Sequence, residues 1–334
     1  MRIIEVVTDP GHVDTLRGIA EQQDILDHWV LPGPPAEDDG PPPRWAVRML
    51  VRPARQQAVL DAVQQAMGTI EGARINIIPV EATLPRPPEV ETDKRASAAR
   101  SREELYEKIA AGARWNSTYL LLVILSTVVA AIGLEADSVA VVIGAMVIAP
   151  LLGPNIALAF ASAVGDTALA GAALRTNLGG LALALGLSVV FGLLWPVDLS
   201  SHELMLRTRV GPADIALALA SGAAAVISLT TGLSSALVGV MVAVALLPPT
   251  ATLGLMLASG HHGQAAGAAL LLAVNIVCVN LAAKVVFLVQ GVRPRTWYER
   301  RKARQSTWFY LIFWLVLFAF LALAVWAWQR LATA

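Results

Sequence analysis

Seven apolar stretches after Trp115, each long enough to cross a bilayer, constrain the fold more than any other feature. A helix needs roughly 20 apolar residues to span the hydrocarbon core, and 56% of the 334 residues are hydrophobic whereas only 15% are charged. Mean hydropathy is +0.61, which is typical of integral membrane proteins. We expect about seven transmembrane helices, at 116–135, 138–164, 167–195, 213–231, 235–259, 264–290 and 307–329.

Lysine and arginine gather at two places that flank these spans. Six lie within 94–114, before the first span, and six within 293–304, between the sixth and seventh spans. Such residues in short loops favour the cytoplasmic side, and an even number of spans separates the two groups. The start, MRIIEVVTDPGH, lacks the pattern of a signal peptide. We therefore expect a multi-pass protein of the cell (inner) membrane with a cytoplasmic N-terminus.

Residues 1–80 have the alternation of a small soluble domain rather than of a span. The expected order of elements is β-α-β-β-α-β, which is that of a ferredoxin-like α+β unit. Such a cytosolic domain would serve packing and assembly, or it would bind a small regulatory ligand. The predicted elements are strands at 2–7, 24–31, 44–52 and 73–80, a helix after Pro10, and a helix at 54–68.

The remainder of the chain divides by composition. A proline-rich, polar stretch indicates a linker, and the seventh span, with Phe and Trp at both ends, lies outside the repeat described next. We expect this extra helix to face lipid or a second copy, and therefore predict a homo-oligomer. The expected parts are a linker and amphipathic helix (81–114), a first membrane repeat (115–195), a second repeat with an external loop (196–291), and a basic loop with the last span (292–334).

An internal repeat relates the two halves of the membrane part at an offset of 95 residues. The offset carries the start of the first span onto the start of the fourth, so each unit contains three helices. Because three is odd, the second copy would lie upside down in the membrane, as in the inverted repeats of many secondary transporters. The matched pairs are Gly144–Gly239, Met146–Met241, Leu151–Leu246, Leu152–Leu247, Pro154–Pro249, Asn155–Thr250, Leu158–Leu253 and Gly165–Gly260.

Both copies contain prolines in the middle of an apolar run, as in VIGAMVIAPLLGPNIALAF (142–160). Proline lacks an N–H and distorts a helix, and the freed backbone groups must face protein, water or a ligand. A packing kink explains one such segment, but two in matching positions favour paired broken helices that form a solute site near the midplane. The candidate residues are Pro150, Gly153, Pro154 and Asn155 in the first copy and Pro248, Pro249, Thr250 and Thr252 in the second.

Polar side chains within the spans supply further candidates. Arg175 and Lys284 either line the cytoplasmic half of the pathway, where they would favour an anion, or extend to the interface. Asp166 caps the third span, pairs with Arg175 or carries a coupling proton. Asn177, Asn275 and Asn280 are expected to form hydrogen bonds between helices, with solute contact as the alternative, which we retain for Asn280.

These patterns favour a transporter or facilitator of a small solute, with an anion as the favoured class. A channel on the same scaffold and a membrane sensor that signals through the cytosolic domain are the alternatives. No HExxH or GxSxG motif is present, and Cys278 is the only cysteine, so we expect no enzyme, catalytic residue, metal site or cofactor. The expected partners are the lipid bilayer, the solute, a small ligand at the cytosolic domain and a second copy, but not nucleic acid.

Three stretches resemble a known family: GAMVIAPLLGPNIALAFASAVGD (144–166), LLPPTAT (246–252) and VNLAAKVVF (279–287). The chain is similar over about 115–290 to the DUF389 family of bacterial membrane proteins, whose characteristic motif runs from GAM through IAP and GP to Gly-Asp. The resemblance implies a membrane protein but no substrate, because the family has no assigned function. The residues that match the motif are Gly144, Ala145, Met146, Ala149, Pro150, Gly153, Pro154, Gly165 and Asp166.

Overall fold

The structure is a computed structural model with two compact units, which we describe separately. One unit comprises Met1–Leu105 with Thr230–Gly232, and the other comprises Tyr106–Leu229 with Leu233–Ala334. The side chains of 102–103, 297–311 and 331–333 are not described. The residues described are 1–23, 25–33, 44–53, 55–68, 70, 72–85, 102–195, 197–231, 246–290 and 297–333.

The first unit contains a four-stranded antiparallel sheet and two helices. The strand order across the sheet is β2-β3-β1-β4, so the first and third strands are central. The alternating and helical segments expected from the sequence are present, with bounds shifted by a few residues. They are β1 Arg2–Thr8, a short turn of 3₁₀-helix at Pro10–His12, α1 Val13–Gln22, β2 Asp27–Leu31, β3 Trp45–Val51, α2 Gln56–Met67 and β4 Arg74–Pro79.

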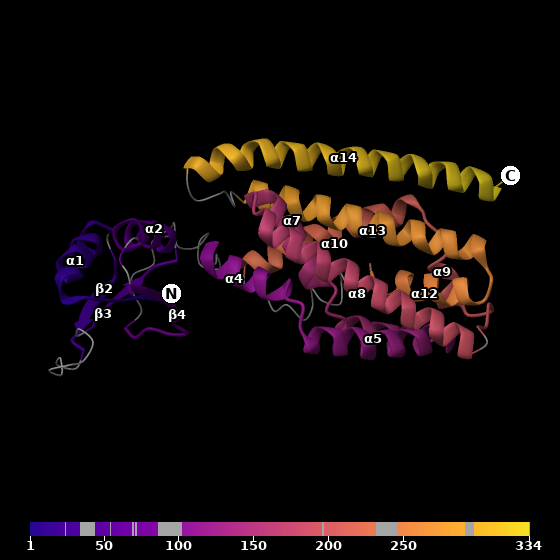
Figure 1. Cartoon of the computed structure of the whole chain (residues 1–334), viewed down its shortest axis with the longest axis horizontal. Helices are drawn as coiled ribbons and strands as arrows, with labels where there is room; N and C mark the ends of the chain where they lie inside the picture. Colours follow the sequence, from indigo (N-terminus) through magenta and orange to yellow (C-terminus); the bar gives the residue numbers. More distant parts are fainter. Residues whose placement is uncertain are drawn as a thin grey trace. The chain divides into compact units, whose positions relative to one another are not determined.

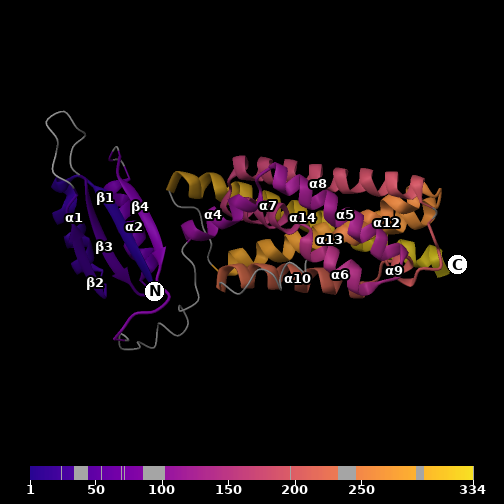
Figure 2. The same ribbon diagram turned by 90° about the horizontal axis from the view of Figure 1, so that it is seen from below.

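One face of this sheet carries the core of the unit. Every second residue of β1 and β3 is buried, which is the period expected when one face of a strand is covered. These side chains pack with the apolar faces of α1 and α2, so both helices cover the same face (Figure 2). Glu5, Arg48 and Asn76 lie in one row on the opposite face.

The stability of this unit is predicted to fall at acid pH because of Glu5. Asn76 Nδ2 (2.9 Å) and Arg48 Nε (2.7 Å) donate hydrogen bonds to the Glu5 carboxylate, and these bonds lower the pKa of Glu5. A lowered folded pKa gives stability that is complete above the ordinary pKa of glutamate and is lost as the pH falls through the folded value. Hydrogen exchange of the β1 amides in the full-length protein, corrected for intrinsic rates, should therefore accelerate below about pH 4.

The Glu5→Gln variant should lose part of this pH dependence, whereas Glu21→Gln, an exposed site on α1, should keep it. An unchanged acid profile in Glu5→Gln would show that another carboxylate controls the effect.

The second unit is helical throughout. Its long helices α5, α8, α13 and α14 run side by side along one direction (Figures 1 and 2). The helices are α4 Arg102–Gly112, which begins in the first unit, α5 Ser117–Glu135, α6 Val139–Ile148, α7 Leu152–Val164, α8 Thr167–Leu194, α9 His202–Leu206, α10 Pro212–Thr231, α12 Leu247–Ala258, α13 His262–Val289 and α14 Trp297–Thr333.

Within the described part of the chain, five helices are long and apolar enough to cross a membrane. They are α5, α8, α10, α13 and the Ile312–Arg330 part of α14. The pair α6–α7 forms a bent sixth candidate, and α12 is shorter than a span. Residues 235–245 of the predicted fifth span lie outside the described residues, so the count of seven remains a prediction.

The helix bounds repeat at the offset seen in the sequence. α10, α12 and α13 begin 95 residues after α5, α7 and α8, and α13 also ends 95 residues after α8. Gly165 and Gly260, another pair at this offset, follow α7 and α12 closely with positive φ of 77° and 75°. Such a conformation favours glycine because a Cβ would be crowded there. Three helices of each half thus begin at equivalent positions and agree in length to within one residue.

Glycines permit close packing in this bundle. An added Cβ at Gly254 on α12 would lie 2.9 Å from the Leu185 carbonyl oxygen of α8, and one at Gly222 on α10 would lie 2.6 Å from the Val279 carbonyl oxygen of α13. Small residues that bring helix backbones together are typical of membrane bundles. Gly254 and Gly222 therefore serve as packing surfaces between helices of this bundle.

Candidate functional site

The break between α6 and α7 is the first component of the candidate site. The two helices meet at an angle of 53°, and Ala149 between them has an extended backbone. Pro150 lies in the connecting turn, whereas Pro154 is the third residue of α7. The first N–H groups of a helix have no partner within it, so Pro154 costs α7 no internal hydrogen bond. Pro154 therefore belongs to the first turn of a new helix and does not lie in the middle of a kinked one.

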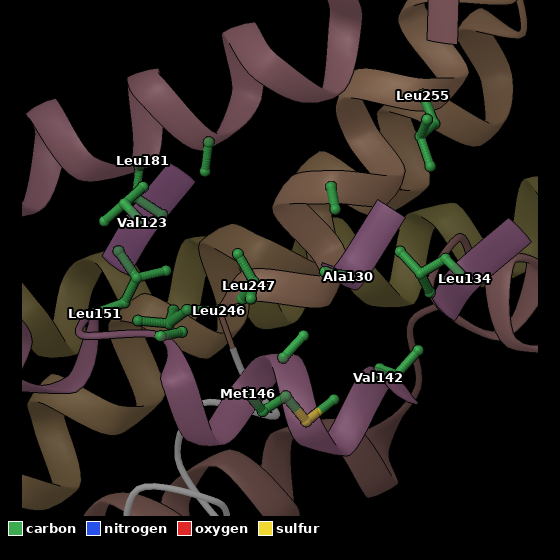
Figure 3. Close-up of a cluster of buried hydrophobic side chains, with 14 of the residues drawn as sticks. Val123, Ala130, Leu134, Val142, Met146, Leu151, Leu181, Leu246, Leu247 and Leu255 are labelled. Carbon is green, nitrogen blue, oxygen red and sulfur yellow. The ribbon is translucent and has the colours of Figure 1, made fainter. Parts of the chain in front are cut away.

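The start of α12 repeats this arrangement. Pro248 and Pro249 are its second and third residues, and the preceding residues up to 245 are not described. Leu151 and Leu246, which are equivalent in the repeat, are both buried and belong to one apolar cluster (Figure 3). The two proline-containing helix starts are thus joined through the residues that precede them. This cluster is apolar, so the polar part of the site lies elsewhere.

Three asparagine side chains form that polar part, which we call the amide cluster (Asn155, Asn177 and Asn280). They come from α7, α8 and α13, and each is at most 5% exposed. Asn155 Oδ1 accepts a hydrogen bond from Asn177 Nδ2 at 3.3 Å and another from Asn280 Nδ2. Asn280 Nδ2 also donates to the Ile276 carbonyl at 2.9 Å. The expectation that Asn177 and Asn280 bond between helices is confirmed.

Some polar atoms of this region have no partner among the residues described. They are Asn155 Nδ2 and Asn280 Oδ1 in the amide cluster and Thr252 Oγ1 on α12. Buried polar atoms are nearly always hydrogen-bonded, and an unpaired one costs about 1–3 kcal/mol. The two free atoms of the amide cluster therefore need an explanation. Thr250 needs none, because its hydroxyl donates to the Leu246 carbonyl at 2.7 Å.

Lys284 lies one helical turn beyond Asn280 on α13 and is fully buried. Phe287, in the next turn, packs edge-on against Phe160 of α7 at 5.2 Å between ring centroids. A charged group in such surroundings is expensive and typical of functional positions in membrane proteins. Its burial argues against the alternative in which Lys284 extends to the interface, whereas a role in lining a pathway remains a prediction.

Arg175 is placed differently. It is exposed on α8, two residues before the buried Asn177, and so does not join the amide cluster. Thr252 lies on α12, which packs against α8 and α13. Among the residues that the sequence singled out, Asn155 and Asn280 are therefore brought into hydrogen-bond contact. Arg175 is set apart, and its role in a pathway remains a prediction.

Asp166 connects the turn between α7 and α8 to α4. One carboxylate oxygen accepts from the Leu169 N–H at 2.9 Å, so Asp166 caps α8 as one sequence alternative expected. The other accepts from the Tyr106 hydroxyl at 2.7 Å. The Tyr106 ring also lies edge-on to Phe160 at 6.0 Å. Sequence reasoning missed Tyr106, because a tyrosine in a charged helix gives no signal of a distant partner.

The Tyr106–Asp166 hydrogen bond gives a testable pH dependence. It raises the pKa of the Tyr106 hydroxyl to about 12, and partial burial adds to the shift. Because the folded pKa is raised, the stabilisation is present below the ordinary pKa of tyrosine and is lost as the pH rises through about 12. Tyr106→Phe should lower stability by about 1 kcal/mol at neutral pH. The difference in absorbance titration between wild type and this variant should show a phenol that ionises near pH 12. Ionisation near 10 would contradict the bond.

α4 also contacts the start of α7. A Cβ at Gly153 would lie 2.7 Å from the Gly112 carbonyl oxygen, so the two backbones touch at these glycines. Thr176 Oγ1 of α8 donates to the Ala113 carbonyl at 2.7 Å. Gly153, a candidate from the sequence, thus provides close packing beside the break.

No three His, Cys, Asp or Glu side chains lie together as a metal site would require, within the residues that the structure covers. The apolar helices, the broken pair and the buried polar cluster define a class, namely a multi-pass helical membrane protein with a small α+β domain at its N-terminus.

The particular family follows from comparison. The profile of the family "Domain of unknown function (DUF389)" matches residues 146–281, which include all three asparagines of the amide cluster. The chain is also 34% identical over 273 residues to an uncharacterized protein of Methanocaldococcus jannaschii, covering 81% of this chain and 84% of the relative. The chain belongs to the DUF389 family, as the resemblance indicated. The relative is archaeal, so a bacterial origin remains a prediction. No solved structure matches the chain.

Proposed function

We propose that this protein is a transporter or facilitator of a small polar solute, with its solute site at the amide cluster. The observation that carries the proposal is the combination of a repeated three-helix unit with unpaired, buried polar atoms beside the helix break. An anchor for a sensor needs neither feature.

The shared bounds at the 95-residue offset support an inverted repeat of three helices each. In this arrangement α5 corresponds to α10, α7 to α12 and α8 to α13, and α14 is the extra helix. Residues near the axis that relates two such halves should lie close to their equivalents in the other half. Leu151 and its equivalent Leu246 do belong to the same apolar cluster. Transporters built in this way hold their solute near the midplane, between broken helices.

The chemistry of the buried polar groups supports a polar solute. The sequence favoured an anion through Arg175 and Lys284, and of these two only Lys284 is buried. The N-terminal domain, which we assign to the ferredoxin-like class from its element and strand order, would regulate transport from the cytoplasm. The orientation with a cytoplasmic N-terminus in the cell membrane, a small ligand at this domain and the homo-oligomer belong to the same proposal.

Counterflow in proteoliposomes tests this function. Full-length protein would be reconstituted and preloaded in turn with small anions, polyols, nucleosides and amino acids, and uptake of the labelled form would be followed. A carrier gives saturable counterflow for one class, and Asn155→Leu should abolish it. The matched control is Gly186→Leu, an exposed position on α8 with no atom within 4 Å of an added Cβ.

The alternatives give different results. A channel on the same scaffold would give flux without saturation or counterflow. A sensor would give neither, and its only stabilising ligand would require residues 1–80. Absence of flux for every class, with correctly folded protein in the vesicles, would overturn the transport proposal.

A further inference from the structure

We infer that the amide cluster selects a neutral solute group that accepts and donates a hydrogen bond side by side, as a carboxamide or a pair of hydroxyls does. The inference rests on the proposed function and specifies the solute class of the same site.

The orientation of two amides is fixed by their partners. The nitrogen end of Asn280 faces two acceptors, the Ile276 carbonyl and Asn155 Oδ1, so its oxygen faces away from both. The oxygen end of Asn155 faces two donors, the nitrogens of Asn177 and Asn280, so its nitrogen faces away. Amide orientation is assigned from such networks. Turning over the Asn155 amide would break the two bonds to its oxygen, and turning over the Asn280 amide would break the two bonds from its nitrogen.

The two free ends therefore differ in kind. Asn155 Nδ2 has N–H groups to donate, and Asn280 Oδ1 has lone pairs to accept, and neither has a partner among the described residues. Asn280 donates to Asn155 through its nitrogen, and Asn155 accepts through its oxygen. In each amide the free atom is attached to the same carbon as the atom that forms this bond. The free donor and the free acceptor thus lie within the span of one small solute.

This pair disfavours charged groups of either sign. A carboxylate only accepts, so it would satisfy Asn155 Nδ2 but leave Asn280 Oδ1 facing another acceptor. An ammonium group only donates and would leave Asn155 Nδ2 unpaired. A carboxamide or a diol satisfies both ends, and sites that hydrogen-bond a solute reject analogues that leave a buried group unpaired. Lys284, one turn away, is the group that would favour an anion instead. Acetate is therefore the probe that decides between an anion and a neutral solute.

The test compares probes of one shape in a thermal-unfolding titration of the detergent-solubilised full-length protein. Acetamide and acetate have the same size and differ in hydrogen bonding and charge, and N,N-dimethylacetamide retains the acceptor without the donor. Acetamide should raise the Tm in proportion to the logarithm of its concentration above its Kd, by about 3 °C at ten times its Kd. Acetate and N,N-dimethylacetamide should not. Erythritol should act like acetamide.

An isosteric variant tests whether the Tm shift caused by acetamide arises at the amide cluster. Asn155→Asp keeps an oxygen for Asn177 and Asn280 but replaces the free donor with an acceptor, so the acetamide shift should disappear. Asn116→Asp is the matched control, because the Asn116 side chain caps α5 as an acceptor only, receiving the Tyr119 N–H. This control should retain the full shift. If Asn155→Asp does not fold, the comparison of the three acetyl probes on wild type still decides the matter.

The outcomes separate the inference from the function. An acetate shift equal to or larger than that of acetamide, or an acetamide shift retained in Asn155→Asp, overturns the inference while transport still stands if counterflow occurs. A lack of any shift with acetamide and erythritol overturns the inference as well. If counterflow is then also absent for every solute class, the proposed function fails with it.

Discussion

Gly254→Leu will destabilise the membrane unit more than any other single change considered. A Cβ at this position would lie 2.5 Å from Ser188 Cβ, 2.9 Å from the Leu185 carbonyl oxygen and 3.0 Å from the Val189 nitrogen, all on α8. Two of these are backbone atoms, which cannot move without shifting the helix. Overpacking of this kind costs about 3 kcal/mol, or about 10 °C in Tm. The measurement is thermal unfolding of the purified protein in detergent.

Gly186→Leu on α8 is the control for this experiment. It adds the same side chain at an exposed position where no atom lies within 4 Å of the new Cβ, so its Tm should match that of wild type. If Gly254→Leu also unfolds like wild type, then α12 does not approach α8 as closely as described.

Asn155→Leu should produce the second largest effect, because Asn155 Oδ1 is the acceptor for two buried donors. Its removal leaves Asn177 Nδ2 and Asn280 Nδ2 without this partner. Each donor left unpaired costs about 1–3 kcal/mol, although Asn280 retains the Ile276 carbonyl. We expect a loss of about 2 kcal/mol in unfolding free energy, measured by denaturant titration in mixed micelles.

Asn177→Leu removes a single donor and leaves the bond between Asn155 and Asn280, so about 1 kcal/mol should be lost. The double variant Asn155→Leu with Asn280→Leu should lose less than the sum of its parts, because replacing both members of a buried pair leaves fewer unpaired atoms. Strict additivity would mean that the two amides are not coupled.

Much of the fold was predictable because local chemistry determines it. The alternation in β1 and β3 and the lengths of the apolar helices follow from burial on one face and from the thickness of a bilayer. The repeat was also visible, since prolines and glycines recur at one offset, and the helix bounds follow that offset. The break near Pro154 was predicted, but its position in the first turn of the second helix was not, because a proline in an apolar run fits both a kink and a helix start.

The candidate site was predictable only in part. Asn155 stood out because it follows a proline in a repeated motif, but nothing in its neighbourhood indicated Asn177 as a partner. Contacts between helices distant in sequence depend on how the bundle packs, and this information is absent from any local pattern. For Arg175 the sequence left both alternatives open, since a charge within an apolar run does not reveal which side of the helix faces inward.

The repeat described above is symmetric in its backbone but not in its chemistry. At the positions equivalent to Asn177 and Asn280 the chain has Leu272 and Leu185, and the position equivalent to Lys284 is Val189. The amide cluster therefore occurs once, and the equivalent positions of the other half do not form a second one. In a carrier of this design the two access states would differ in energy. The empty protein would rest predominantly open to one compartment, and the half-saturating concentrations for solute added on the two sides of the membrane would then differ.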